Sequence, residues 1–136
     1  MYAEIKKDIL GEGYSLSVAF VSTKKSKELN KKYRRKDKPT NVLSFALHEN
    51  EGELILCKEV IQREARSQKI NYQNYLLFLV IHGMLHLKGM IHSSKMDKAE
   101  KFYCKKYGQK YFGGHRRGLP DDSSRRGRIS KRRNYS

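Results

Sequence analysis

The sequence predicts a small single domain of the α+β class, in which a short β-sheet is surrounded by helices. The chain has 136 residues, a usual length for one domain and enough to bury a hydrophobic core. Three short segments have the apolar pattern of strands, and five longer segments have the length or spacing of helices. One helical segment is apolar on nearly all sides, so it must lie inside the fold.

The first part of the chain alternates helices with a strand. Residues 2–10 are expected to form a short helix that ends at a glycine-containing turn. Residues 15–22 alternate large apolar side chains with smaller ones, which predicts a strand with one buried face. Ser22 is suited to cap the next helix, over residues 24–33, whose surface is cationic.

The second part contains the buried helix. Strands are predicted at residues 41–47 and 53–57, and helices at residues 58–69, 71–88 and 94–107. The helix over residues 71–88 is the one that is apolar on nearly all sides, and Gly89 is placed to end it.

The charge is strongly unbalanced. Lys and Arg number 30 against 14 Asp and Glu, a formal charge of +16. Residues 113–136 contain eight Lys and Arg, two Asp and almost nothing to bury, which predicts a disordered basic tail after a domain of residues 1–112. The tail supplies +6 of this charge, so the domain itself keeps +10. This surplus favours nucleic acid as the partner class, with an anionic membrane surface second.

Several other classes of protein are excluded. The longest apolar run is too short to span a bilayer, and the first residues lack the pattern of a secretory signal. Cys57 and Cys104 are too far apart in sequence to suggest a disulfide framework or a cysteine zinc site. Buried thiols in a reducing cytosol are the expectation for both.

Three of the five histidines fall within eleven residues: His82, His86 and His92. The first two are four residues apart, so their rings project from one face of the predicted helix. Gly89 then allows the chain to turn and His92 to return to the same point. Three imidazoles with one coordination position open indicate a catalytic zinc site that activates water. Nickel, cobalt and copper accept the same ligands, and the alternative without a metal is a set of buried core histidines.

The spacing of these histidines is similar to that of the zincin proteases, with one difference. Those enzymes have a glutamate directly after the first histidine as their general base, whereas this chain has Gly83. Glycine cannot accept a proton, so the sequence argues against peptide hydrolysis by that mechanism. A base would have to be a metal-bound hydroxide or a residue from elsewhere in the chain.

A second unusual segment covers residues 29–45. It carries six Lys and Arg, among them Arg34, between a predicted helix and a predicted strand. Such a cluster suits contacts to phosphates, and the nearby aromatic residues Tyr33 and Phe45 are of the type that stacks on unpaired bases. The alternative for most of the lysines is an ordinary solvated loop.

These two segments together resemble the YbeY family. HGMLHLKGMIH resembles the family signature HGxLHLxGYDH, and YRRKDKPTNVLSF resembles its other signature, YRxxDxPTNVLSFP. The resemblance covers roughly residues 15–107, with the motifs in matching order. Met90 and Ile91 replace the usual Tyr-Asp, which removes a carboxylate that could orient a metal ligand, and Ala46 replaces a proline. The N-terminus is short, so a first strand of the family's sheet is expected to be missing or reduced.

The resemblance implies a short mixed sheet and a bacterial, cytoplasmic, metal-dependent endoribonuclease specific for single strands. It implies a role in ribosomal RNA processing, including maturation of the 16S rRNA 3′ end, and in ribosome quality control. The implied ligands of one zinc ion are His82, His86 and His92, and the family's functional arginine corresponds to Arg34. The expected partners are single-stranded or ribosomal RNA and the small ribosomal subunit, with no membrane and no small-molecule cofactor.

Two other functions are compatible with parts of this pattern. The first is an RNA-binding ribosome-assembly factor whose metal is structural and which catalyses no reaction. The charge supports it equally. The second is a metallopeptidase, which Gly83 and the charge of +16 both disfavour. In the nuclease hypothesis, Arg34 stabilises negative charge on the phosphoryl oxygens while the metal site acts on the scissile phosphate.

Overall fold

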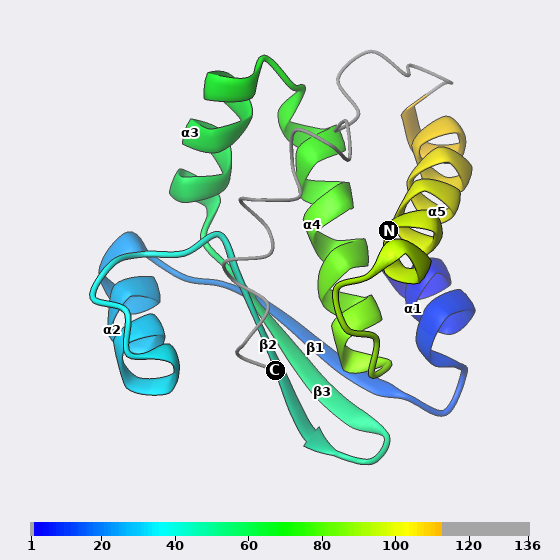
Figure 1. Cartoon of the computed structure of the whole chain (residues 1–136), viewed down its shortest axis with the longest axis horizontal. Helices are drawn as coiled ribbons and strands as arrows, with labels where there is room; N and C mark the ends of the chain where they lie inside the picture. The colour runs from blue at the N-terminus through cyan, green and yellow to red at the C-terminus, as the bar shows by residue number, and fades with distance from the viewer. Residues whose placement is uncertain (1, 113–136) are drawn as a thin grey trace.

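A three-stranded sheet and five helices make up residues 2–112, the part of the chain that this computed structural model describes (Figure 1). The elements follow in the order α1 (Tyr2–Leu10), β1 (Ser15–Phe20), α2 (Thr23–Arg34), β2 (Val42–His48), β3 (Glu51–Leu56), α3 (Lys58–Gln68), α4 (Tyr72–Leu87) and α5 (Ser94–Phe112). The predicted α+β class is confirmed. The predicted basic tail, residues 113–136, lies outside the described residues.

The sheet is mixed, with the strand order β1-β3-β2. The central strand β3 pairs in parallel with β1 and antiparallel with β2, so that Val18 and Ser44 both lie opposite Leu54. A tight turn joins β2 to β3, whereas the parallel partner β1 is reached only through α2 and β2. The register of β2 shifts once, at a bulge between Ala46 and His48.

The predicted elements are all present, and their ends differ by a few residues. Ser22 caps α2 as expected, since its hydroxyl accepts a hydrogen bond from the backbone N–H of Lys25 at 3.1 Å. The last helix continues to Phe112, beyond the predicted end at residue 107. It passes through Gly108, because one glycine inside a helix costs only about 1 kcal/mol. Phe20, expected on the buried face of its strand, is half exposed at the end of the edge strand β1.

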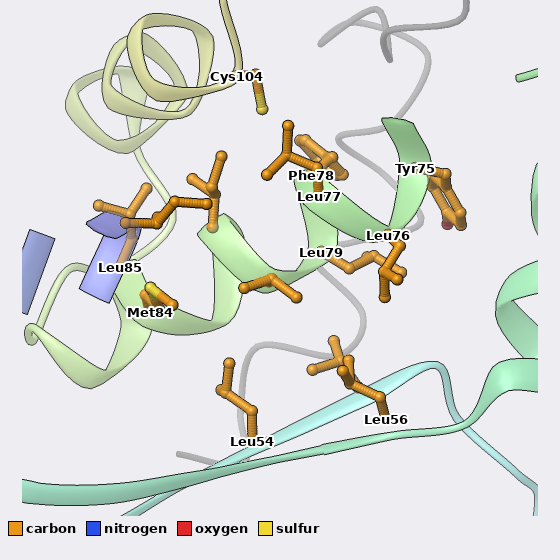
Figure 2. Close-up of a cluster of buried hydrophobic side chains, with 14 of the residues drawn as sticks. Leu54, Leu56, Tyr75, Leu76, Leu77, Phe78, Leu79, Met84, Leu85 and Cys104 are labelled. Carbon is orange, nitrogen blue, oxygen red and sulfur yellow. The ribbon is translucent and has the colours of Figure 1, made fainter. Parts of the chain in front are cut away.

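Helix α4 is the centre of the molecule. Every residue from Asn74 to His86 is buried, because the sheet, α1, α3 and α5 all pack against this helix. Leu54 and Leu56 project from β3 toward α4 in the main hydrophobic cluster (Figure 2). Complete burial of such a side chain stabilises the fold by roughly 1.5–3 kcal/mol. The apolar character of this segment around its whole circumference is therefore explained by its position between the sheet and three helices.

The sheet packs closely against α4 at Gly83. A Cβ atom at this position would lie 2.7 Å from Cδ2 of Leu54 and 3.1 Å from Oγ of Ser44. Both of these neighbours are fully buried, so neither can move aside into solvent. The Ser44 hydroxyl also donates a long hydrogen bond of 3.4 Å to the Gly83 carbonyl. The absence of a side chain at Gly83 is thus a requirement of packing between α4 and the sheet.

The N-terminal helix is held to the last helix by a polar contact. The ammonium group of Lys106 and the hydroxyl of Tyr107 each donate a 2.7 Å hydrogen bond to one carboxylate oxygen of Asp8. These two donors lower the pKa of Asp8 below its ordinary value of 3.8. The contact fixes α1 and α5 side by side on the same side of α4, as Figure 1 shows.

Both cysteines are buried free thiols, as the sequence predicts. Cys57 precedes α3 at its N-cap position but makes no side-chain capping bond there. No helix within the described residues is long and apolar enough to cross a membrane.

Replacing Gly83 by valine is expected to lower the free energy of unfolding by about 2 kcal/mol or more, because the added methyl groups overlap Leu54 and Ser44. Urea denaturation followed by circular dichroism measures the change. Gly13→Val is the matched control, since a Cβ at Gly13 meets nothing within 4 Å. It should stay within about 0.5 kcal/mol of the wild type. Equal effects at the two positions would contradict the close-packing argument.

Candidate active site

Two of the predicted metal ligands meet inside α4. The Nε2 atoms of His82 and His86 lie 3.1 Å apart, and the ring planes are nearly perpendicular. Both side chains are buried, with 1 % and 7 % of their surface exposed. The helix brings the rings together because residues four apart lie on one face. A nitrogen pair in this arrangement, with little water nearby, can share a proton or bind a cation.

A carboxylate holds the first histidine from its other side. Nδ1 of His82 contacts Oε2 of Glu100, which projects from α5 and is itself 4 % exposed. A carboxylate oxygen can only accept a hydrogen bond, so Nδ1 of His82 carries the proton as donor and the lone pair of the ring is on Nε2. His86 then donates its Nε2–H to that lone pair. A histidine whose outer nitrogen is bonded to a carboxylate is the usual arrangement of a metal-ligating histidine.

The chain turns sharply after this pair. Gly89 has a φ of +104°, in the left-handed region that favours glycine. Its N–H and that of Met90 donate to the carbonyls of His86 and Leu85 at 2.9 and 3.0 Å, which ends α4. The role predicted for Gly89 is confirmed. His92 follows in the loop before α5, partly buried, and its Nδ1 has no hydrogen-bond partner within the described residues.

The third histidine does not complete a three-ligand group in this structure. Within residues 2–112, no three His, Cys, Asp or Glu side chains are placed so that together they could hold a metal ion. The structure thus brings His82 and His86 together and leaves His92 outside their group. The donor set nevertheless suits a metal, because it offers two converging imidazole nitrogens and a carboxylate on one of these rings. In the loop after α4 it also offers a buried nitrogen of His92 that has no hydrogen-bond partner among residues 2–112.

Arg34, the predicted catalytic arginine, is the last residue of α2. Its side chain is half buried, and its Nη1 donates to Oδ1 of Asn30, one turn earlier, at 3.3 Å. Arg35 follows in the left-handed conformation, with a φ of 58°, and terminates the helix. Arg34 therefore lies at a helix end, on a different element from the histidines.

Two buried polar residues of α2 hold the loop that follows Arg34. Nδ2 of Asn30 donates to the Lys38 carbonyl at 2.8 Å. The hydroxyl of Ser26 both donates to the Thr40 carbonyl and accepts from the Thr40 N–H, each at 2.9 Å. Both Ser26 and Asn30 are 1 % exposed, so these bonds are shielded from water. They fix the backbone of the basic loop, residues 35–41, against α2.

The end of the same loop is joined to the helix of the histidines. Nδ2 of Asn41 donates to Oε1 of Glu64 in α3 at 2.8 Å, and the hydroxyl of Tyr75 in α4 donates to that same oxygen at 2.8 Å. One carboxylate oxygen thus connects the basic loop, α3 and the first turn of α4. The two sequence motifs are thus linked through Asn41, Glu64 and Tyr75, which lie outside α2 and outside the turn that follows His86.

Comparison with known proteins finds relatives that share one name. The family model described as Endoribonuclease YbeY matches residues 2–108. A Staphylococcus carnosus protein named Endoribonuclease YbeY is 36% identical over 109 residues, which cover 71% of this chain and 71% of that protein. The protein of the same name from Staphylococcus saprophyticus is 38% identical over the same share of both chains.

The chain belongs to the endoribonuclease YbeY family. The solution structure of TM1509 from Thermotoga maritima is similar to it, with a TM-score of 0.64 and 33% sequence identity. That match covers 82% of this chain and 79% of the other. The family resemblance stated from the two motifs, and the short mixed sheet that it implied, are confirmed.

The structure also supplies a carboxylate that the sequence analysis missed. The family signature has an aspartate where this chain has Ile91, and Ile91 is 76 % exposed, so its side chain extends into solvent. The carboxylate that contacts His82 comes from Glu100 instead. A sequence signal existed, because Glu100 is on the same stripe of α5 as the buried residues Met96 and Cys104. A charged residue on the buried stripe of a helix indicates that it has a polar partner inside the fold.

Asn30→Ala is expected to lower the free energy of unfolding by about 1–3 kcal/mol, because it removes two hydrogen bonds of a buried side chain, to the Lys38 carbonyl and from Nη1 of Arg34. Urea denaturation measures this loss. Lys31→Ala, one residue further along α2 and exposed, is the control and should be nearly neutral. A neutral Asn30→Ala would show that the loop does not depend on the bond to the Lys38 carbonyl.

Proposed function

We propose that this chain is a metal-dependent endoribonuclease that hydrolyses phosphodiester bonds in single-stranded RNA. The observation that carries the proposal is the buried pair of histidine nitrogens, 3.1 Å apart, with Glu100 on the far side of His82, in a chain of charge +16. The names of the relatives support the activity. Ribosomal RNA, including the 3′ end of 16S rRNA on the small subunit, is the substrate that we propose, in the bacterial cytoplasm.

We assign the metal to His82, His86 and His92, with zinc as the ion. Two Nε2 atoms already converge, and the buried Nδ1 of His92, which lacks a hydrogen-bond partner within the described residues, marks that ring as the third donor. When bound, zinc supplies a Lewis acid that polarises the phosphate and lowers the pKa of water. Neutral imidazoles suit zinc, and no cysteine thiolate is needed.

Glu100 prepares the site by fixing the tautomer of His82. Because the carboxylate accepts a hydrogen bond from Nδ1–H, the lone pair of Nε2 points toward His86. The buried position of all three groups keeps this orientation, since a rotated ring would lose its hydrogen bond to a carboxylate inside the core. Glu100 is therefore a positioning residue.

Arg34 is the residue that we assign to the phosphate. A guanidinium group presents a planar fork of N–H donors to phosphoryl oxygens and remains charged at neutral pH. Asn30 restrains this side chain through Nη1, and the hydrogen bonds of Ser26 and Asn30 hold the loop beside it. Arg34 would stabilise the negative charge that develops during cleavage. The surrounding lysines attract the RNA backbone without selecting sequence.

Cleavage of an end-labelled single-stranded RNA by tag-free protein tests the activity. We expect the wild type to cut and a chelator to stop it. His86→Ala and Arg34→Ala should each lose activity by at least about 100-fold, the scale of losing a ligand or a charge-stabilising donor. The two variants, purified identically, also control for contaminating ribonuclease. Circular dichroism confirms that they fold.

Two outcomes would contradict this function. Equal cutting by all three proteins would identify a contaminant. Equal RNA binding by all three, without cutting even when zinc is added, would instead favour a ribosome-assembly factor with a structural metal.

Zinc affinity measured by competition with a chromophoric chelator tests the assignment of Glu100. Glu100→Gln is expected to weaken zinc binding by about 10- to 100-fold, because the amide accepts the His82 proton less strongly than a carboxylate does. Glu59→Gln makes the same chemical change at an exposed position in the first turn of α3 and should have no effect. Unchanged zinc affinity in a folded Glu100→Gln protein would remove Glu100 from the site.

A further inference from the structure

An aromatic side chain stands exposed beside the basic loop. Tyr33, in the last turn of α2, has 52 % of its surface exposed. Its ring packs edge-on against Phe45 of β2, with centroids 5.1 Å apart and the planes inclined by 67°. Nζ of Lys32 lies 5.1 Å from the centroid of the Tyr33 ring. The ring is therefore supported by a second aromatic residue and is reached by a cationic group.

The surroundings of Tyr33 are cationic. Residues 23–41 contain nine Lys and Arg against Glu28 and Asp37. Asp37 forms a loose ion pair of 3.9 Å with Lys27, so it neutralises little of the charge at the helix end. Lys31, Lys32 and Arg35 are exposed. A polyanion that reached this surface would meet ammonium and guanidinium groups of the residues that precede and follow Tyr33 in the chain.

This surface lies on the other face of the sheet from α4. Phe45 belongs to the smaller hydrophobic cluster with Leu43, Ile55 and Leu29, whereas its neighbour Ser44 contacts Gly83 of α4. Consecutive strand residues point to opposite faces, and β2 is an edge strand. Figure 1 shows α2 on the opposite side of the molecule from α1 and α5. Tyr33 is thus outside the histidine site but adjacent to Arg34 in sequence.

We propose that the ring of Tyr33, supported by Phe45, is a stacking platform for one unpaired base of the RNA substrate, with Lys31, Lys32 and Arg35 on the adjacent phosphates. This rests on the proposed function, because it takes single-stranded RNA as the ligand. Every base offers a face for stacking, so the platform is tolerant of sequence. A base inside a duplex has both faces covered, so the platform selects single strands.

The support by Phe45 makes the platform more than an exposed tyrosine. The edge contact limits rotation of the ring, and the bonds of Asn30 and Ser26 keep the loop after α2 in place. The ring is therefore held in position before RNA arrives, which reduces the entropy lost on binding. Lys32 need only move its flexible end from the ring to a phosphate.

The test uses a 2′-O-methyl decanucleotide of uridines with one central 2-aminopurine, whose fluorescence falls on stacking and whose backbone resists ribonucleases. We expect wild type and Tyr33→Phe to bind it alike and to quench the fluorescence. Tyr33→Leu, which keeps an apolar contact with Phe45 but has no aromatic ring, should bind at least about fivefold more weakly and quench less. Phe102→Leu is the control, since Phe102 is also exposed and also packs edge-on against a neighbour, Tyr103.

A decamer of abasic residues with the same charge separates stacking from electrostatics. Tyr33→Leu and wild type should bind it equally. Lys32→Gln should bind both oligomers more weakly, and the slope of log affinity against log salt concentration should fall by about one. The platform would be overturned if Tyr33→Leu bound the 2-aminopurine oligomer as tightly as the wild type does. It would also be overturned if Tyr33→Leu lost as much affinity for the abasic oligomer as for the 2-aminopurine one. Cleavage by the wild type and its loss in His86→Ala are measured in a different assay from oligomer binding. Failure of the platform and failure of the nuclease assignment therefore remain distinguishable.

Discussion

The burial of α4 on all sides is the constraint from which the rest of the structure follows. A helix enclosed by a sheet and three other helices can carry polar side chains only where each one finds a partner inside the core. His82 and His86 meet that condition with each other and with Glu100. The arrangement is costly for a fold that needs only stability, since apolar residues of the same size would fill the space. The histidine pair is therefore best understood through its chemistry.

The same enclosure explains why this site cannot work as a zincin protease does. A glutamate after the first histidine would have to occupy the position of Gly83, and the buried side chains of Leu54 and Ser44 fill that space. The base is absent for a steric reason that originates in the sheet. Similar histidine spacing thus occurs in a different arrangement, in which the carboxylate comes from α5 and contacts the His82 ring.

The sequence predicted the order of the elements, the buried helix and two of the converging side chains, because apolar periodicity and helical spacing are local properties. It did not predict Glu100, Ser26 or Asn30, whose roles depend on what faces them across the fold. All three lie on helices with many charged residues. The pattern of apolar residues cannot show which polar residue of such a helix is buried. The sequence analysis expected His92 to return to the histidine pair, but its position depends on the loop after Gly89, where no periodicity operates.

Strand β2 connects the two functional surfaces through its alternation. Ser44 faces Gly83 of α4, and Phe45 supports Tyr33 on the other face of the sheet. A slip of β2 by one residue would exchange these faces and disrupt both surfaces together. The register is held by the pairing of Ser44 with Leu54 and of Phe45 with Glu53, and the bulge occurs only after Ala46. The irregularity of the edge strand is thus confined to its end, so Ser44 and Phe45, which lie between the candidate active site and the proposed stacking platform, remain in regular pairing.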